Sequence, residues 1–182
     1  MTNLTNKVAE RMPGARRAKN PVKKALLTVL AAFVALGTIE AQTVSNQDTV
    51  ALEVVNNFFG KFKSGATPEE LANFFDEKAE LYIPGDTKNV PWIGKRTGRK
   101  EIAESFRLLK HHIQPEKLLF TDMVTKGNRV VVLGYLESRM KRNGNIMKSE
   151  FSIDIVVENG LLTRYHLLED SFEVSRAVKP LK

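Results

Sequence analysis

The sequence predicts an α+β domain in which three N-terminal helices pack on a strongly curved, mostly antiparallel sheet. Helical patterns dominate the first half of the chain, and four strand-like runs follow one another in the second half. The connections between these runs are short, so neighbouring strands must be antiparallel. Helices followed by such a meander give an α+β domain whose sheet curls around the helices and encloses a cone-shaped space.

The first helix is predicted from Asp48 to Phe62, where apolar residues recur at intervals of three and four. Gly65 ends it. Thr67 is the predicted N-cap of a second helix, which has proline in its first turn and glutamate three residues after the cap. A short strand, Ala79 to Ile83, and a loop with proline, tryptophan and glycine complete this part of the domain.

A third helix is predicted from Arg99 to about His111, before the four strands. The predicted strands are Leu118–Thr125, Arg129–Met140, Ile146–Val157 and Leu161–Leu168. A short closing helix, Asp170–Val178, follows them.

Length and composition fit one such domain with an N-terminal appendage. The chain has 182 residues, of which 42% are hydrophobic and 27% charged, and a domain typically uses about 100 to 150 residues. It contains no cysteine, which excludes a disulfide scaffold, thiol catalysis and zinc held by cysteine. We predict an export segment over residues 1–41, a linker over 42–47, the domain over 48–178 and a tail over 179–182.

Residues 1–41 have the three features of a secretory signal. Two lysines precede an uncharged run from Ala25 to Ile39, and Ala41 is a small residue at its exit. We expect cleavage after Ala41 and a periplasmic or secreted mature protein. The alternatives are an uncleaved membrane anchor, although a spanning helix needs about 20 apolar residues and Glu40 interrupts this run, or a buried core helix.

The basic charge of the chain belongs mostly to this segment. The formal net charge is +7, but residues 1–41 hold most of the excess, and the small remainder does not indicate the basic stripe of a nucleic-acid-binding domain. Arg139, Lys141, Arg142 and Lys148 flank a turn signal, so a solvated hairpin tip explains them better than a phosphate site. We expect no nucleic-acid partner, and membrane contact only through an uncleaved N-terminal segment.

Two stretches are distinctive: VPWIGKRTGRKEI, from Val90 to Ile102, and YHLLEDSFEVSRAV, from Tyr165 to Val178. Together with the order of the elements, they resemble the SnoaL-like branch of the nuclear transport factor 2-like superfamily, and the likeness covers Asp48 to Val178. That superfamily includes ketosteroid isomerases, polyketide cyclases, epoxide hydrolases, dehydratases and proteins that only bind a molecule in the cone. The resemblance implies a small hydrophobic ligand or substrate.

The resemblance also suggests candidate catalytic residues. Ketosteroid isomerases use a tyrosine, an aspartate base and a protonated aspartate. The tyrosine and the base fall at Phe58 and Ile83, so both groups are missing, and only the protonated aspartate has a counterpart, Asp154. The resemblance to polyketide cyclases implies an acid/base carboxylate beside a histidine. The cluster of His166, Glu169 and Asp170 matches this pair only loosely. Asp154 and His166 are therefore the candidate catalytic residues.

The residues leave open which face of the sheet Asp154 occupies. Strand alternation puts it on the face of Glu150 and Ser152, opposite Ile153 and Ile155. If that face lines an apolar cone, desolvation raises the pKa of Asp154 and lets it donate as a neutral acid. If the face meets solvent, Asp154 is an ordinary surface carboxylate.

The predicted pocket lining consists mainly of ring-bearing side chains. Trp92 lies in a proline-bounded loop where its ring can cover a pocket mouth, and His166 titrates near neutrality. Tyrosines in such a fold also fill the core, which is the alternative for Tyr82 and Tyr135. The full predicted lining is Phe58, Tyr82, Trp92, Tyr135, Asp154 and His166. No cofactor is expected, and no spaced set of histidines or carboxylates predicts a metal.

The strands are apolar on both faces, which predicts assembly. On the predicted strand Arg129–Met140, one face carries Val130, Val132 and Leu136. The other face carries Val131, Leu133 and Tyr135. Helices of the same chain can cover one face, so the other predicts a two-fold, sheet-to-sheet homodimer. The expected function is that of an exported binding or interaction module. The alternative is a proton-transfer enzyme of isomerase, cyclase or dehydratase type that uses Asp154 and His166.

Overall fold

The structure is a computed structural model that describes residues 45–179. The predicted export segment, residues 1–41, lies outside this range. Within it, ten helices and strands follow one another in an order close to the predicted one.

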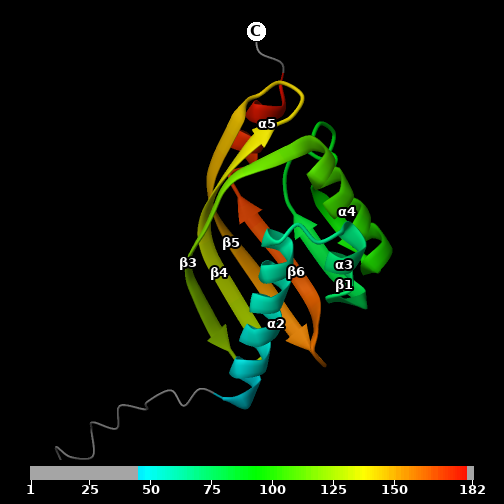
Figure 1. Cartoon of the computed structure of the whole chain (residues 1–182), viewed down its shortest axis with the longest axis vertical. Helices are drawn as coiled ribbons and strands as arrows, with labels where there is room; N and C mark the ends of the chain where they lie inside the picture. The colour runs from blue at the N-terminus through cyan, green and yellow to red at the C-terminus, as the bar shows by residue number, and fades with distance from the viewer. Residues whose placement is uncertain (1–44, 180–182) are drawn as a thin grey trace, which may run out of the picture. The chain divides into compact units, whose positions relative to one another are not determined.

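Six strands form a single mixed sheet in the order β2-β1-β6-β5-β4-β3. Strands β3 to β6 make an antiparallel meander, β1 runs parallel to β6, and β2 pairs antiparallel with β1. The predicted α+β class with a curved, mostly antiparallel sheet is confirmed (Figure 1). The strands are β1 (Phe75–Ile83), β2 (Gly94–Thr97), β3 (Ile113–Lys126), β4 (Arg129–Met140), β5 (Ile146–Glu158) and β6 (Leu161–Glu169).

Three helices, α2 (Asn46–Lys63), α3 (Pro68–Ala72) and α4 (Gly98–His112), lie on one side of the sheet (Figure 1). The fourth, α5 (Ser171–Val178), follows β6. Capping boxes begin α2 and α3, because the side chains of Ser45 and Thr67 each accept a hydrogen bond from the backbone N–H three residues on. The Thr67 cap is the predicted one.

The two largest departures from the predicted elements both involve strands. Strand β2 lies in the stretch predicted as a loop, where its edge pairs with β1 from Glu80 to Ile83. Strand β3 begins at Ile113, earlier than predicted, and includes Pro115. Because β3 is an edge strand with a register shift after Pro115, the missing N–H of the proline leaves the pairing with β4 largely intact.

The core lies between the helices and the concave face of the sheet, and Phe58 is at its centre. The Phe58 side chain is fully buried, and six other aromatic rings surround it at centroid distances of 5.1 to 6.4 Å. The strands contribute alternate residues to this core. On β5, Phe151, Ile153 and Ile155 are buried, while the residues between them face the other side of the sheet.

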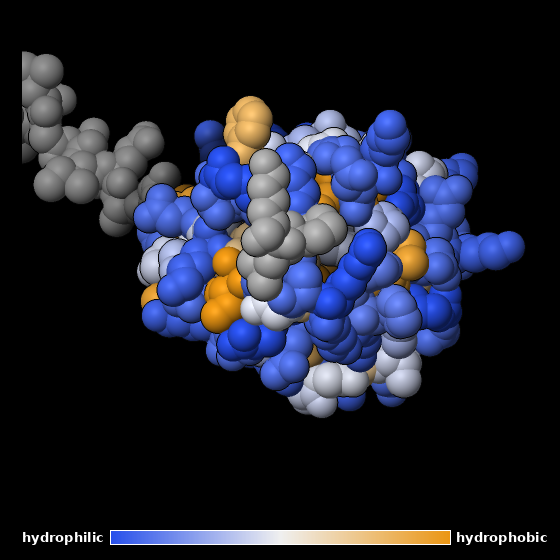
Figure 2. Space-filling model, turned by 90° about the horizontal axis from the view of Figure 1, so that it is seen from above, coloured by the Kyte–Doolittle hydropathy of each residue, from blue (hydrophilic) through white to orange (hydrophobic). Residues whose placement is uncertain are grey.

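The end of the domain that carries α5 has a mainly hydrophilic surface, on which hydrophobic side chains show only in separate small areas (Figure 2). Among residues 45–179, no helix is both long enough and apolar enough to cross a membrane.

Candidate functional site

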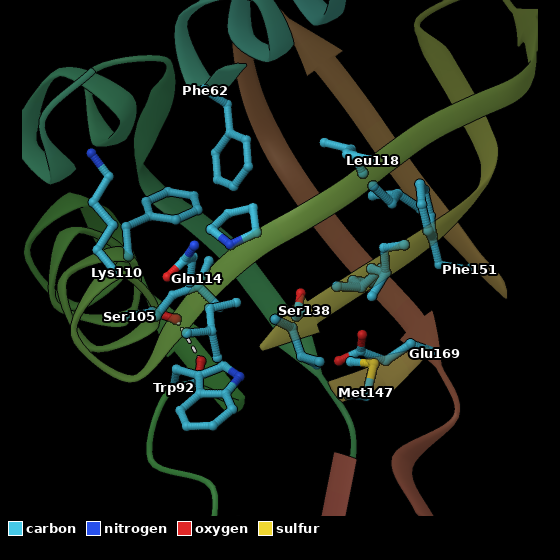
Figure 3. Close-up of a pocket in the computed structure, with 18 of the residues that line it drawn as sticks. Phe62, Trp92, Ser105, Lys110, Gln114, Leu118, Ser138, Met147, Phe151 and Glu169 are labelled. Atoms are coloured by element: carbon cyan, nitrogen blue, oxygen red, sulfur yellow. Dashed lines mark hydrogen bonds between the residues drawn. The ribbon is translucent and has the colours of Figure 1, made fainter. Parts of the chain in front are cut away.

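A cavity of about 590 Å³ lies between the helices and the concave face of the sheet. This volume falls within the range of about 300–1,000 Å³ that is usual for small-molecule sites. Most of the lining is apolar (Figure 3). The apolar side chains of the lining are Phe59, Phe62, Leu81, Ile83, Trp92, Phe106, Leu109, Ile113, Pro115, Leu118, Phe120, Leu136, Met140, Met147, Phe151, Ile153 and Leu167.

Glu169 supplies the one carboxyl group among the described residues that line this cavity. It is the last residue of β6, and strand alternation puts it on the same face as Tyr165 and Leu167, which also line the cavity. Burial raises the pKa of Glu169 to about 7, with no charge or hydrogen-bond partner in the described chain to offset it. Its carboxyl group therefore exchanges a proton with its surroundings close to neutral pH.

Tyr165 adds a phenol hydroxyl to the wall near Glu169. Its side chain is buried, and burial, followed by the charge of Glu169, raises the pKa of the phenol above its usual value. The hydroxyl therefore stays protonated at neutral pH and is available as a hydrogen-bond donor.

Two serines are also buried in the wall, Ser105 and Ser138. The Ser105 hydroxyl donates a 2.7 Å hydrogen bond to the Trp92 carbonyl oxygen, which ties α4 to the loop before β2 (Figure 3). This bond positions the Trp92 backbone against the cavity. An apolar space with a few such polar groups can hold and orient a small molecule.

Trp92 is the member of the predicted lining that lies in the cavity wall. Its side chain is buried, and its ring centre is 5.3 Å from that of His112 at the end of α4. Phe58 is not among the lining residues. It is fully buried at the centre of the aromatic cluster, in contact with Phe59 and Phe62, which do line the cavity.

The other four residues of the predicted lining face the opposite side of the sheet, here called the outer face. Cross-strand partners share a face, and Tyr82 pairs with His166, which pairs with Asp154. Tyr135 pairs with Glu150, two residues before Ser152 on the same face. This placement corrects the predicted lining, because each of these side chains points away from the cavity. Catalysis by Asp154 and His166 stays a prediction. Their position on the outer face, away from the cavity, does not support it.

On the outer face, Asp154 is bound by two arginines from neighbouring strands. Both Nε and Nη2 of Arg129 donate to its carboxylate at 2.6 Å, and Nε of Arg164 donates at 2.9 Å. The Arg129 guanidinium beside it, helped by Arg164, lowers the pKa of Asp154 despite some burial. Asp154 is therefore a charged carboxylate that links β4, β5 and β6.

His166 contacts a carboxylate on β1. Its Nε2 is 2.6 Å from Oε1 of Glu80, whose other oxygen is 2.5 Å from the Lys95 ammonium. The hydrogen bond from Lys95, followed by the one from His166, lowers the pKa of Glu80. His166 and Glu169, which are close in sequence, thus lie on opposite faces, and Asp170 caps α5. In the part of the chain that the structure describes, no three histidine, aspartate or glutamate side chains are placed to hold a metal.

Comparisons with known proteins agree on the architecture. No family model and no curated protein sequence matches the chain. Among solved structures, an NTF2-like protein from Burkholderia xenovorans is 20% identical with a TM-score of 0.64, and the match covers 74% of this chain and 100% of that one. This chain has the nuclear transport factor 2-like (NTF2-like) fold.

Two further matches are complexes with small molecules. The protein TerC, co-crystallised with polyporic acid, is 18% identical with a TM-score of 0.62, covering 71% of this chain and 98% of that one. A protein of ketosteroid isomerase-like fold from Catenulispora acidiphila, in complex with trimethylamine, is 14% identical with a TM-score of 0.53, covering 63% and 83%. At these identities the likeness shows the NTF2-like fold alone, and the SnoaL-like branch stays a prediction.

Within this NTF2-like fold, the positions matched to the isomerase tyrosine and base are occupied by the apolar residues Phe58 and Ile83. Phe58 is buried in the core, and Ile83 lines the cavity. The cavity carboxyl comes instead from Glu169, which sequence reasoning placed only in a loose cluster with His166 and Asp170. The signal that could have identified it is its spacing from Tyr165, since residues four apart on a strand share a face. Using that signal requires knowing which face of β6 is buried.

Proposed function

We propose that this NTF2-like domain binds a small, mainly apolar molecule in the cavity between the helices and the sheet. The observation that carries the proposal is an apolar space of about 590 Å³ with few polar groups, among them Tyr165 and Glu169. Such a combination binds by burial of apolar surface and orients its ligand by a small number of hydrogen bonds. The two complexes with small molecules in the same fold support this proposal.

The test is a pair of tryptophan substitutions on adjacent residues of β3. Leu118 lines the cavity, whereas Leu119 is 47% exposed on the outer face. Leu118→Trp fills the space, so binding of the fluorescent apolar probe 1-aminoanthracene should weaken by about tenfold or more, which corresponds to a loss of about 1.4 kcal/mol or more. Leu119→Trp should bind like the wild type. Equal binding by both variants, or no binding by the wild type, contradicts the proposal.

A second candidate function is proton transfer by Glu169. A general base works best when its pKa lies near the operating pH, and Glu169 has a pKa of about 7 in an apolar site. Its carboxylate can take a proton from the carbon beside a ligand carbonyl, leaving an enolate, and return that proton to the ligand. The neutral Tyr165 hydroxyl can donate to the carbonyl oxygen as its charge grows.

This chemistry can be separated from binding by deuterium exchange. The NMR signal of the carbon-bound protons beside the carbonyl of decalone, an apolar bicyclic ketone, should disappear in deuterium oxide faster as pH rises through 7. Glu169→Gln should slow this exchange by about 10²- to 10⁴-fold while keeping 1-aminoanthracene binding. Exchange no faster than without protein would leave binding alone as the function.

Export remains part of the proposed function. Its support is the uncharged run from Ala25 to Ile39, which follows two lysines and is followed by the small residue Ala41. Mass spectrometry of the fractionated protein should find a chain that begins near Gln42 outside the cytoplasm. A full-length product in the cytoplasm would contradict export, and a full-length product in the membrane fraction would support the anchor.

We also propose that the outer face joins two copies of the chain. Several large apolar side chains are exposed there, beside the ion pairs of Asp154. They are Tyr82, Leu119, Val124, Leu133 and Leu168. Light scattering at micromolar concentration should give a dimer, and Leu133→Lys should give a monomer. A monomeric wild type contradicts the proposal.

A further inference from the structure

The charged residues that line the cavity are concentrated at its rim. Four lysines line the cavity against one acid, Glu169. Lys63, Lys117 and Lys141 are exposed, as are Gly65 and other lining residues near them, whereas the aromatic and sulfur-containing residues deeper in the wall are mostly buried. The exposed part of the lining therefore marks the mouth, and lysines surround it.

Three of the ammonium groups lie on this rim. The Lys63 ammonium, at the end of α2, is 4.2 Å from the ring centre of Phe120 in the cavity wall. Lys110 donates to the carbonyl oxygens of Gly65, at 3.1 Å, and Ala66, and Lys141 donates to the carbonyl oxygen of Lys110 at 2.6 Å. The ends of α2 and α4 thus hold Lys110 and Lys141 together.

Lys117 differs from these three. Its ammonium is 5.3 Å from the ring centre of Tyr135, which belongs to the outer face. We therefore define the lysine rim as Lys63, Lys110 and Lys141.

The lysine rim is not neutralised by the groups around it. Within residues 45–179, none of its three ammonium groups has a carboxylate within 4.0 Å. The hydrogen bonds of Thr67 in the α3 capping box, and to a smaller extent the charges of Lys61 and Lys110, lower the pKa of Glu70. The C-terminus of a helix carries about half a negative charge. Two helix ends thus offset only part of three positive charges.

We infer that the ligand is an amphipathic anion whose apolar body fills the cavity and whose single acidic group lies at the lysine rim. This inference rests on the proposed binding function and adds the charge and the orientation of the ligand. An anion at the mouth gains the attraction of three ammonium groups without losing its hydration completely. Glu169 lies on the other side of the cavity from Lys110 (Figure 3). A ligand bound the other way round would therefore bring its acidic group close to the Glu169 carboxyl.

The test compares three probes that share one alkyl chain: decanoate, decan-1-ol and decyltrimethylammonium. Each displaces 1-aminoanthracene from the full chain below its micelle concentration. Decanoate should bind about tenfold more tightly than decan-1-ol at low salt, since exposed pairs contribute about 0.2–1 kcal/mol each. Decyltrimethylammonium should bind more weakly than the alcohol. The advantage of decanoate should shrink to about twofold at about 1 M salt, where screening shortens the Debye length to about 3 Å.

Substitutions on the lysine rim locate the effect. Lys63→Met, Lys110→Met and Lys141→Met should each reduce the preference for decanoate over decan-1-ol by about two- to fivefold. Lys100→Met is the matched control, because Lys100 is exposed on α4 but does not line the cavity, and it should change neither probe. Equal affinities for decanoate and decan-1-ol in the wild type overturn the inference while the binding function stands. Failure of every probe, including 1-aminoanthracene, overturns both.

Discussion

The two faces of the sheet give the same functional group opposite properties. Glu169 and Asp154 lie on adjacent strands, but Glu169 faces an apolar cavity and Asp154 faces two guanidinium groups on the outer face. Burial raises the pKa of the first to about 7, and the arginines lower the pKa of the second. The face of the strand, rather than the residue type, decides whether a carboxyl group is a structural ion-pair partner or a group available to a ligand.

The two faces also differ in the partners that they provide for carboxyl groups. On the outer face, carboxylates are paired with basic side chains across strands, as in the contacts of Asp154 and Glu80. On the concave face, the Glu169 carboxyl has no such partner among the described residues. The Glu169 carboxyl is half-buried and opens onto the cavity, so it is desolvated by the apolar wall and free to bind a ligand group there.

The largest expected difference between the faces is in packing. Phe58→Ala should lower the free energy of unfolding by about 3–5 kcal/mol, because it empties the centre of the aromatic cluster. Leu133→Ala on the outer face, where the side chain of a single chain is 38% exposed, should lower that of the monomer by about 1 kcal/mol or less. Urea denaturation of both variants measures the difference. Similar losses would mean that the outer face is as fully packed as the concave one.

A glycine on β4 gives the next largest effect. A methyl group at Gly134 would lie 2.3 Å from the Leu119 carbonyl oxygen and 2.4 Å from Cζ of Phe151. Gly134→Ala should therefore destabilise the domain by about 1–3 kcal/mol, measured by urea denaturation. Gly60→Ala is the control, since no atom lies within 4 Å of that position and alanine favours the helix by about 0.5–1 kcal/mol. A harmless Gly134→Ala would show that Phe151 does not pack tightly across β4.

Glu169 should contribute to the free energy of unfolding with a pH dependence opposite to that of an ordinary paired carboxylate. The folded pKa of Glu169 is raised, so its stabilising contribution is complete below the unfolded value of about 4.3 and is lost as pH rises through about 7. Glu169→Gln should therefore be more stable than the wild type at pH 8, by on the order of 1–2 kcal/mol, and equal to it near pH 4. Thermal melts across this range measure the gap. A variant less stable than the wild type at pH 8 would mean that the carboxylate has a partner.

The smallest expected effect has the opposite pH dependence. The folded pKa of Asp154 is lowered, so its contribution is present above the unfolded value of about 3.9 and is lost as pH falls through the folded one. Asp154→Asn should lower stability at pH 7 by up to about 1 kcal/mol, because the pair is partly exposed to solvent. Melts at pH 7 and at successively lower pH should show the loss shrink as the carboxylate is protonated. Binding of 1-aminoanthracene should not change, and weakened binding would restore Asp154 to the site.

The sequence was sufficient for the architecture because local signals and the fold agree. The stripe on the first helix, the Thr67 cap and the turns between the last four strands each specify one structure. The short strand β2 was missed because its four residues lie in a loop-like stretch and pair only with the edge of β1. A strand that short has no hydrophobic period to detect.

The site could not be predicted in the same way. Alternation on β5 separates Asp154 from Ile153 and Ile155, but it does not say which set faces the helices when the strands are apolar on both sides. The resemblance to ketosteroid isomerases suggested Asp154 as a catalytic residue without deciding its face, and the structure places its side chain on the outer face. Glu169 was overlooked because its role depends on the cavity formed by distant elements rather than on its neighbours in sequence.

Carbon-detected NMR of the side-chain carboxyl groups, followed over a pH titration of the intact protein, tests the contrast between the two faces most directly. Glu169 should titrate with a midpoint near 7, and Asp154 should titrate below its ordinary range. Adding decan-1-ol, which fills the cavity and excludes water, should raise the midpoint of Glu169 further and leave that of Asp154 unchanged. A Glu169 midpoint near that of an ordinary glutamate, about 4.3, or a shift at Asp154 in place of Glu169, would contradict the assignment of the site to the concave face.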